Sequence, residues 1–229
     1  MTFEAGPVTS AEAVPFRHIA VPSRPRGISI AKLVFDKLFA AAALLTVAPV
    51  MLGVAVALKL GDGGPVFYRH KRVGQHGKAF YCLKFRSMRT DGDALLADLL
   101  ANDPAARAEW ERDQKLADDP RVHPVGRFLR KTSLDELPQF WNVLRGDMSI
   151  VGPRPIITAE AAKYGVHFAD YCAVRPGVTG AWQVGGRNLI GYADRVKLDV
   201  DYVHNATFAD DLRIVLKTIT VVLAQRGAS

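Results

Sequence analysis

The sequence predicts an α+β protein of mostly short helices with one small β-hairpin or sheet, held at a membrane by a proline-broken helix and by interfacial amphipathic helices. Three observations predict this architecture. Apolar residues make up 49% and charged residues 23% of the 229 residues, which is ordinary globular composition. An uncharged run of membrane length lies near the N-terminus, and a strand-like cationic segment follows it. Short helical patterns then alternate with Gly- and Pro-rich turns.

The positive charge is concentrated in the first third of the chain. The formal net charge is +7, and the first 80 residues carry ten basic and four acidic side chains. This distribution is typical of a nucleic-acid binder or of a protein that rests on anionic lipid. The two cysteines, Cys82 and Cys172, have no metal-ligand spacing and indicate no disulfide framework.

The chain divides into three parts. Residues 1–30 are rich in proline and small residues, which predicts a mobile tail, and they lack the basic start and apolar core of a secretory signal peptide. Residues 31–60 contain the apolar segment. Residues 61–229 form a larger domain that ends in an amphipathic helix.

The apolar run Leu38–Leu58 contains 21 residues without a charge. A continuous helix of this length reaches roughly 30 Å, the thickness of the hydrocarbon core of a bilayer. A buried helix in a soluble core is the alternative, but such a helix normally keeps a polar face and this segment has none. We therefore predict membrane insertion.

Pro49 lies at the middle of this run. Proline removes a backbone donor and clashes with the preceding turn, so we expect the helix to bend or break there. The positive-inside rule favours the cytoplasm for each basic flank, but a helix that crosses the membrane has its two flanks on opposite sides. A re-entrant hairpin bent at Pro49 satisfies both flanks, and a kinked helix that crosses the membrane stays open as the alternative. The flanking cations are Arg24, Arg26, Lys32 and Lys37 before the run, and Lys59, Arg69, Lys71 and Arg72 after it.

Three further segments have patterns of their own. Alternating Phe80, Cys82 and Phe85, preceded by two glycines, predict a β-hairpin within residues 66–88. Residues 90–119 are expected to form a helical segment on the surface that carries no catalytic or binding residues. The apolar stripe at the C-terminal end of the chain predicts an amphipathic helix. This helix either packs against the domain or lies in the membrane interface, and both alternatives stay open. This stripe comprises Leu212, Val215, Leu216, Ile219, Val222 and Leu223.

The adjacent carboxylates Asp135 and Glu136 are the first candidates for chemistry. Ser133 and Glu136 fit a capping box, which predicts a helix that begins near Leu134. The positive end of that helix and nearby upstream cations would favour ionised carboxylates. An ionised aspartate in this setting can bind a divalent metal or attack phosphorus as a nucleophile. A surface helix start without chemistry is the ordinary alternative. The upstream cations are Arg127, Arg130 and Lys131.

Four arginines beside Gly or Pro follow in predicted turns. Single surface arginines are mostly solvated, but four of them after a carboxylate pair indicate an anionic substrate such as a diphosphate. They are Arg145, Arg154, Arg175 and Arg187. Neither a P-loop nor a dinucleotide-binding glycine motif is present, so these two classes of nucleotide site are not supported.

Five longer motifs occur in order along the chain, together with the proline-broken apolar segment. They are Lys84–Met88, Arg130–Gln139, Asn142–Ser149, Val151–Pro155 and Arg175–Gly180. Together they resemble the bacterial sugar transferases, the monotopic polyprenol-phosphate phosphoglycosyl transferases. The resemblance covers about residue 30 to the C-terminus. In length and motifs the chain is most similar to the small members that consist of the catalytic module, such as galactosyl- or glucosyl-phosphate transferases that initiate exopolysaccharide synthesis.

The resemblance implies transfer of a hexose-1-phosphate from a UDP-sugar to polyprenol phosphate, with release of UMP. It places residues 61–229 as a cytosolic catalytic domain at the bacterial inner membrane. Asp135 matches the family's nucleophile, which forms a covalent aspartyl-phosphosugar intermediate, and Glu136 matches the residue that helps hold Mg²⁺. Asp199 is expected as a second metal ligand. The expected substrate- or phosphate-binding residues are Lys84, Arg86, Arg130, Arg154, Arg175, Gln183 and Arg187.

Two other classes of function stay open at this point. A membrane-anchored regulatory protein with an inactive site would not need the intact pair Asp135 and Glu136. A nucleic-acid-binding protein would account for the basic third of the chain, but not for the apolar segment. The expected partners are a UDP-sugar, polyprenol phosphate and membrane lipid, with a homodimer as an open alternative and no nucleic acid.

Overall fold

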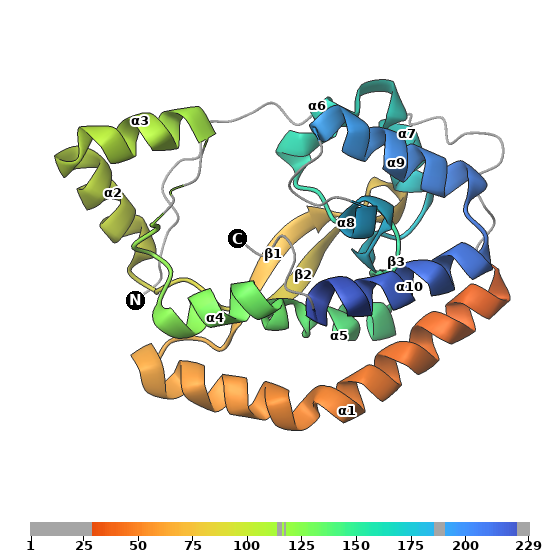
Figure 1. Ribbon diagram of the computed structural model, residues 1–229, viewed down its shortest axis with the longest axis horizontal. Coiled ribbons are helices and arrows are strands. Elements are labelled where there is room, and N and C mark those ends of the chain that lie inside the picture. Colours follow the sequence, from red (N-terminus) through yellow and green to blue (C-terminus); the bar gives the residue numbers. More distant parts are fainter. Residues whose placement is uncertain (1–28, 114–115, 117, 186–190, 224–229) are drawn as a thin grey trace.

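The computed structural model describes residues 29–113, 116, 118–185 and 191–223. The tail predicted for residues 1–30 therefore lies outside the described residues, except for its last two. Figure 1 shows mostly short helices around two small sheets, which confirms the α+β prediction. The helices are α1 (Ile30–Asp62), α2 (Gly92–Asn102), α3 (Pro104–Asp113), α4 (Pro124–Thr132), α5 (Gln139–Arg145), α6 (Ala161–Tyr164), α7 (Phe168–Ala173), α8 (Ala181–Gly185), α9 (Tyr192–Asn205) and α10 (Phe208–Leu223). The strands are β1 (Phe67–Val73), β2 (Ala79–Phe85), β3 (Ser149–Val151) and β4 (Gly177–Thr179), and the 3₁₀ turns are η1 (Gln75–Gly77), η2 (Leu134–Glu136), η3 (Thr158–Glu160) and η4 (Gly165–His167).

The hairpin predicted within residues 66–88 is confirmed. Strands β1 and β2 pair antiparallel, from Phe67 opposite Phe85 to Val73 opposite Ala79. Cys82 and Phe85 are both buried, and because they are three residues apart on β2 they face opposite sides of the hairpin. The tip of the hairpin lies against α7, at the side of the domain away from α1 (Figure 1).

The helical excursion at residues 90–119 is two helices rather than one. Helix α2 ends at Asn102 and α3 begins at Pro104, because proline cannot continue a helix but fits its first turn. The carboxylate of Asp103 caps α3 by accepting hydrogen bonds from the backbone of Ala105 and Ala106, at 2.8 and 3.0 Å. Figure 1 shows this pair of helices projecting to one side of the molecule.

Helix α1 continues through Pro49 for 33 residues. Figure 1 shows that it bends near its middle, but it does not form two antiparallel halves. Among the described residues it is the one helix long and apolar enough to cross a membrane. Leu38, Leu45 and Leu52 form a stripe that is 66–79% exposed, which rules out the alternative of a buried core helix. Whether the segment is re-entrant or spanning stays a prediction.

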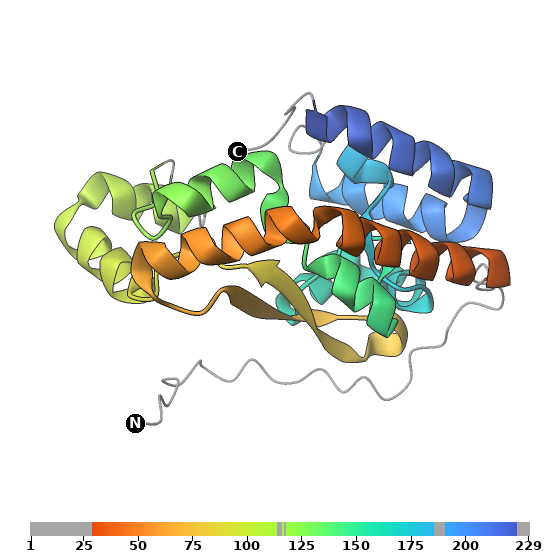
Figure 2. The same ribbon diagram turned by 90° about the horizontal axis from the view of Figure 1, so that it is seen from below.

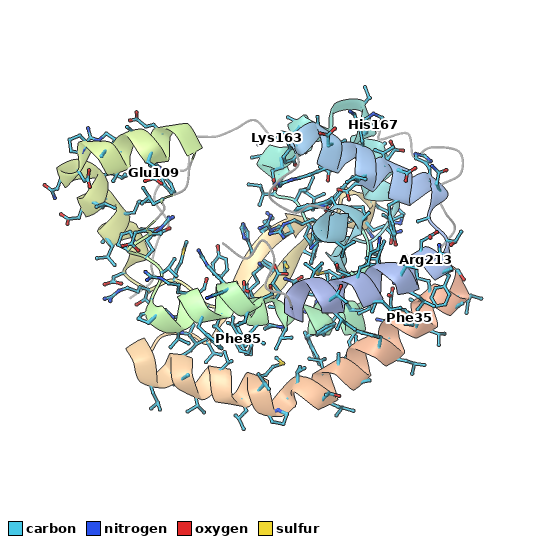
Figure 3. The ribbon with its side chains drawn as sticks, viewed as in Figure 1. Phe35, Phe85, Glu109, Lys163, His167 and Arg213 are labelled. Atoms are coloured by element: carbon cyan, nitrogen blue, oxygen red, sulfur yellow. The ribbon has the colours of Figure 1, made fainter. Side chains whose placement is uncertain are left out.

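The other side of α1 holds the helix on the domain. Helix α1 packs mainly against α5, β3 and α4. Figure 2 shows α1 running across the domain, and Figure 3 shows Phe35 and Phe85 between α1 and the rest of the domain. Lys32 forms an ion pair with the buried Asp211 at 3.0 Å, and Lys37 donates to the Val143 carbonyl at 3.0 Å. Two of the four basic residues counted before the apolar run thus bind the protein itself, which weakens the charge argument for a re-entrant form.

The predicted stripe of α10 is divided between two environments. Val215 is partly buried, whereas Leu212, Leu216 and Ile219 are 40–65% exposed, and the buried Ile214 was not part of the predicted stripe. The side chains of Val222 and Leu223 lie outside the described residues. Phe128 on α4 and Trp141 on α5 are also more than half exposed. These exposed apolar side chains favour an interfacial position for α10 over simple burial.

Candidate active site

A cavity of about 1000 Å³ opens between the hairpin, α4, η2, α5, α8 and α10. It has a polar part and an apolar part. The polar part is lined by Lys84, Arg86, Arg89, Arg121, Arg130, Arg154, Asp135 and Glu136. The apolar part is lined by Phe39, Phe140, Ile150, Val178, Val184, Val215 and Ile219. The cavity therefore combines charged side chains with apolar ones, some of which come from α1 and α10.

The two candidate carboxylates stand on η2, a single 3₁₀ turn between α4 and α5. The predicted capping box is wrong. Ser133 has the left-handed conformation (φ 58°) and ends α4, with its N–H donating to the Arg130 carbonyl, and its hydroxyl caps no helix. An N-cap residue needs extended backbone angles, which Ser133 does not have. A 3₁₀ helix does begin at Leu134, near the predicted start, but the α-helix that follows, α5, begins only at Gln139.

Asp135 is 8% exposed and lines the cavity. Burial raises the pKa of its carboxyl above the usual range, and this effect outweighs the opposing charge of Lys84. Glu136 raises the pKa further, while Arg130 lowers it. The expectation that nearby cations leave Asp135 with a low pKa is therefore wrong, because it ignored desolvation. Arg127, one of those cations, pairs instead with the exposed Asp118 at 3.0 Å.

Lys84 binds both carboxylates. Its Nζ lies 2.6 Å from Glu136 Oε1 and 3.5 Å from Asp135 Oδ2, and all three side chains are 12–25% exposed. The lysine comes from β2 and the carboxylates from η2, so the hairpin and the α4–α5 connection meet here. One cation between two partly buried carboxylates keeps both close together in spite of their like charges.

Arg130 also faces the cavity, as predicted. Its Nε donates to the hydroxyl of Ser87 at 2.9 Å, which joins α4 to the chain that follows β2. Gly126 makes this approach feasible, because a Cβ there would lie 1.9 Å from the Ser87 carbonyl oxygen.

Arg154 and Gln183, two further predicted residues, also line the cavity. The guanidinium of Arg154 lies 5.8 Å from the centre of the Trp182 ring, and both residues line the cavity. The side-chain amide of Gln183 donates to the Val178 carbonyl at 3.2 Å. Both residues follow the parallel pair of β3 and β4.

Three predicted phosphate-binding residues have other positions. Arg86 lines the cavity, but its guanidinium donates to the carbonyls of Pro65 and Met88 at 2.6 and 2.9 Å, so it fixes the backbone around the hairpin. Arg175 is absent from the cavity lining and lies near Lys37 of α1. Arg187 lies outside the described residues.

Asp199, the predicted second metal ligand, is not beside Glu136. It is 2% exposed on α9, accepts a hydrogen bond from the Tyr164 hydroxyl at 2.7 Å and does not line the cavity. Burial raises the pKa of Asp199 to about 7, although the hydrogen bond from Tyr164 and the charge of Arg195 lower it. The Asp199 side chain is therefore part of a buried polar contact with Tyr164 and not of the cavity wall.

This raised pKa makes stability depend on pH. Between about pH 4 and 7 the unfolded chain ionises Asp199 while the folded protein keeps it protonated, so stability falls as pH rises, and the loss is complete above pH 7. Asp199→Asn removes this penalty and keeps an acceptor for Tyr164. We expect the free energy of unfolding of the variant to exceed that of wild type increasingly as pH rises from about 4 to 7, by at most about 4 kcal/mol.

Thermal unfolding as a function of pH measures this difference. Asp201→Asn, an exposed change on the same helix, is the matched control and is expected to follow wild type throughout. An Asp199→Asn variant whose stability relative to wild type does not change with pH would contradict the assignment.

The carboxylates of Asp135 and Glu136 supply some, but not all, of the ligands that Mg²⁺ needs. Magnesium in phosphate-handling sites is usually held by one or two carboxylates together with substrate oxygens and water. Asp135 and Glu136 offer two carboxylates on the cavity wall. Within the described residues no group of three or more His, Cys, Asp or Glu side chains forms a closed metal site. An ion held by Glu136 and by substrate phosphate suits this arrangement.

Sequence reasoning missed one wall of the cavity. Tyr68, His70 and Arg72 line it from β1, on the face that they share with Lys84. The signal was present, since residues two apart on a strand share a face. Without the strand register, nothing related these residues to the carboxylates.

Comparisons with known proteins agree with the geometry. A family model described as bacterial sugar transferase matches residues 28–225. The exopolysaccharide production protein ExoY of Sinorhizobium fredii is 49% identical over 205 residues, which cover 90% of this chain and 90% of that protein. The undecaprenyl-phosphate galactose phosphotransferase of Salmonella typhimurium is 51% identical over 197 residues, which cover 86% of this chain and 41% of that protein. The UDP-glucose:undecaprenyl-phosphate glucose-1-phosphate transferase of Xanthomonas campestris is 38% identical over 207 residues, or 87% of this chain and 40% of that protein.

Proposed function

The chain belongs to the bacterial sugar transferase family, and we propose that it transfers a hexose-1-phosphate from a UDP-sugar to polyprenol phosphate and releases UMP. The names of its relatives in Salmonella and Xanthomonas support a sugar phosphate as the transferred group and a polyprenol phosphate as its acceptor. One observation carries the proposal for this chain. The pair Asp135 and Glu136, bridged by Lys84, faces a cavity that is cationic at one part and apolar beside the membrane helix.

In the first step a carboxylate oxygen of Asp135 attacks the β-phosphorus of the UDP-sugar. The bond from this phosphorus to the bridging oxygen breaks, and UMP leaves with that oxygen and its electron pair. The sugar phosphate is then esterified to Asp135. Repulsion between a carboxylate and a diphosphate is the main obstacle, and Lys84, Arg130 and Arg154 reduce it by placing positive charge around the cavity.

In the second step an oxygen of polyprenol phosphate attacks the same phosphorus. The bond to Asp135 breaks, the carboxylate is regenerated, and polyprenol-diphosphate-sugar leaves. The apolar part of the cavity, with Phe39 from α1 and Ile219 from α10, suits the first isoprene units of the acceptor. We expect the phosphate to reach Asp135 from the side of these two helices while the isoprene chain stays in lipid.

Glu136 is the residue that would hold Mg²⁺ against the diphosphate. Bound there, the ion would neutralise negative charge on the phosphate oxygens. Lys84, 2.6 Å from Glu136, orients that carboxylate on the cavity wall.

The proposal is tested by incubating the full-length protein in lipid or detergent with a panel of UDP-hexoses and UDP-N-acetylhexosamines plus polyprenol phosphate. A lipid-linked sugar and an equal amount of UMP are the expected products. UMP without a lipid product, or neither product with any donor, would contradict the proposal.

The nucleotide sugar is a cytosolic compound, so we propose that the catalytic domain faces the cytoplasm and that α1 enters and leaves the membrane on this face. Ser29→Cys and Gly61→Cys place one thiol at each end of α1. Both positions are exposed, and a Cβ at Gly61 meets no atom within 4 Å. The native cysteines, Cys82 and Cys172, are buried and give little background.

We expect a membrane-impermeant maleimide to label both engineered thiols from the cytoplasmic side and neither from the outside of intact cells. Labelling of the two ends from opposite sides would show that α1 spans the membrane. Pro49→Ala is the informative partner variant, because removing the proline is expected to straighten the helix and to favour opposite-side labelling.

A further inference from the structure

We propose that His70 and Arg72, on the cavity face of β1, bind the nucleotide sugar together with Arg154, and that they do not bind the lipid acceptor. The inference rests on the proposed function and names the side of the cavity that receives the donor.

The strand register places these residues next to the reacting groups. Tyr68 is the direct cross-strand partner of Lys84, whose Nζ is 2.6 Å from Glu136. Tyr68, His70 and Arg72 follow one another on the same face, about 7 Å apart per pair of residues. This wall therefore extends roughly 13 Å from the carboxylate pair toward the hairpin tip, a length comparable to a nucleoside diphosphate.

The direction of the wall selects the donor. The hairpin tip lies against α7, away from α1 (Figure 1). The apolar side chains that suit a polyprenol chain come from other elements than β1, namely Phe39 on α1, Phe140 on α5, and Val215 and Ile219 on α10. A substrate bound along β1 thus extends away from the membrane helix, which is possible for a soluble nucleotide and not for a membrane-embedded lipid.

The charges on the wall match a diphosphate. Arg72 is held by the Pro155 carbonyl at 3.1 Å and has Glu160 at 3.7 Å. Burial and the neighbouring guanidinium of Arg154 lower the pKa of Arg72, so two arginines stand close together in the wall. Lys84 adds a third cation, but it lies between the carboxylates of Asp135 and Glu136. At the arginine pair itself, two guanidiniums face the carboxylate of Glu160, and an anionic ligand between the arginines would offset the remaining positive charge.

His70 presents a hydrogen-bond donor of known orientation. Its Nδ1 lies 3.1 Å from Nη2 of Arg72. A guanidinium can only donate, so Nδ1 accepts, and the proton of the neutral ring is on Nε2. Burial, Arg72 and Lys84 lower the pKa of His70 to about 4, which keeps the ring neutral. The Nε2–H is then available for an oxygen of the nucleotide sugar.

The experiment compares Arg72→Met with Arg69→Met in the full-length protein. Arg69 is exposed on the opposite face of the same strand, so the control removes the same charge away from the cavity. For Arg72→Met we expect kcat/KM for the UDP-sugar to fall about 10- to 100-fold and the Kd for UMP to rise in parallel. The kcat/KM for polyprenol phosphate stays within about a factor of two, since in a two-step reaction it reports the second half only. Arg69→Met is expected to match wild type.

His70→Phe is the second variant, because it keeps the ring beside Tyr68 and removes the donor. We expect kcat/KM for the UDP-sugar to fall about 3- to 10-fold, again without effect on the acceptor. Equal losses for both substrates, or unchanged UMP binding in either variant, would overturn the inference. A wild-type protein that binds UMP but transfers no sugar phosphate would refute the proposed function and leave the nucleotide site in place.

Discussion

Asp135→Asn is expected to lower turnover by about four orders of magnitude or more, because an amide cannot attack phosphorus. Among the described residues, the other carboxylates that line the cavity are Asp93 on α2 and Glu136, which the proposal assigns to the metal ion. The change keeps the size and shape of a side chain that is only 8% exposed, so packing around η2 is preserved. UMP release and formation of the lipid product are both expected to stop, since both half-reactions need the carboxylate oxygen of Asp135.

Asp118→Asn is the matched control. Asp118 is an exposed aspartate that pairs with Arg127 outside the cavity, and its variant is expected to keep wild-type rates. Asp135→Asn with rates within about tenfold of wild type would show that another group is the nucleophile.

Lys84→Met is expected to lower kcat/KM for the UDP-sugar by about 10²- to 10³-fold. Lys84 lies 2.6 Å from Glu136 and 3.5 Å from Asp135, and without it two partly buried carboxylates have no cation between them. Lys84 also lowers the pKa of Asp135, so its removal raises that pKa further. The attacking form is the ionised carboxylate; the acidic limb of the pH–rate profile is therefore expected to move to higher pH, and part of the loss is recovered in alkaline solution.

The pH dependence of kcat/KM for the donor measures this shift. Lys84→Arg keeps the charge and is expected to restore part of the activity with the limb near its wild-type position. Lys71→Met, an exposed lysine on the same hairpin, is expected to change neither quantity. A loss of activity in Lys84→Met with an unmoved acidic limb would contradict the role of Lys84 toward Asp135.

The parts of the fold that follow from local patterns could be predicted from the sequence. The hairpin is encoded by period-two alternation and two glycines, and the uncharged run defines α1. The break before Pro104 was missed, although Asp103 and Pro104 together are a local signal for the start of a helix. Ser133 was misread for a related reason. A serine before a carboxylate pair fits a helix start, and only the preceding turns show that it ends α4.

The chemistry of the site was predicted better than its geometry. Asp135, Glu136 and Lys84 come together from motifs 50 residues apart. The position of a residue in a motif does not tell which way its side chain points. For this reason the sequence did not predict that Arg175 lies near α1 or that Asp199 is buried beside Tyr164. The raised pKa of Asp135 could not be predicted either, because desolvation depends on tertiary packing that no local pattern encodes.

Mass spectrometry of the enzyme quenched after mixing with a UDP-sugar, in the absence of polyprenol phosphate, tests the central claim most directly. The account predicts a mass increase equal to one sugar phosphate on the peptide that contains Asp135, which disappears when the lipid acceptor is added and never forms in Asp135→Asn. An unmodified peptide in enzyme that makes lipid-linked product at its full rate would contradict it.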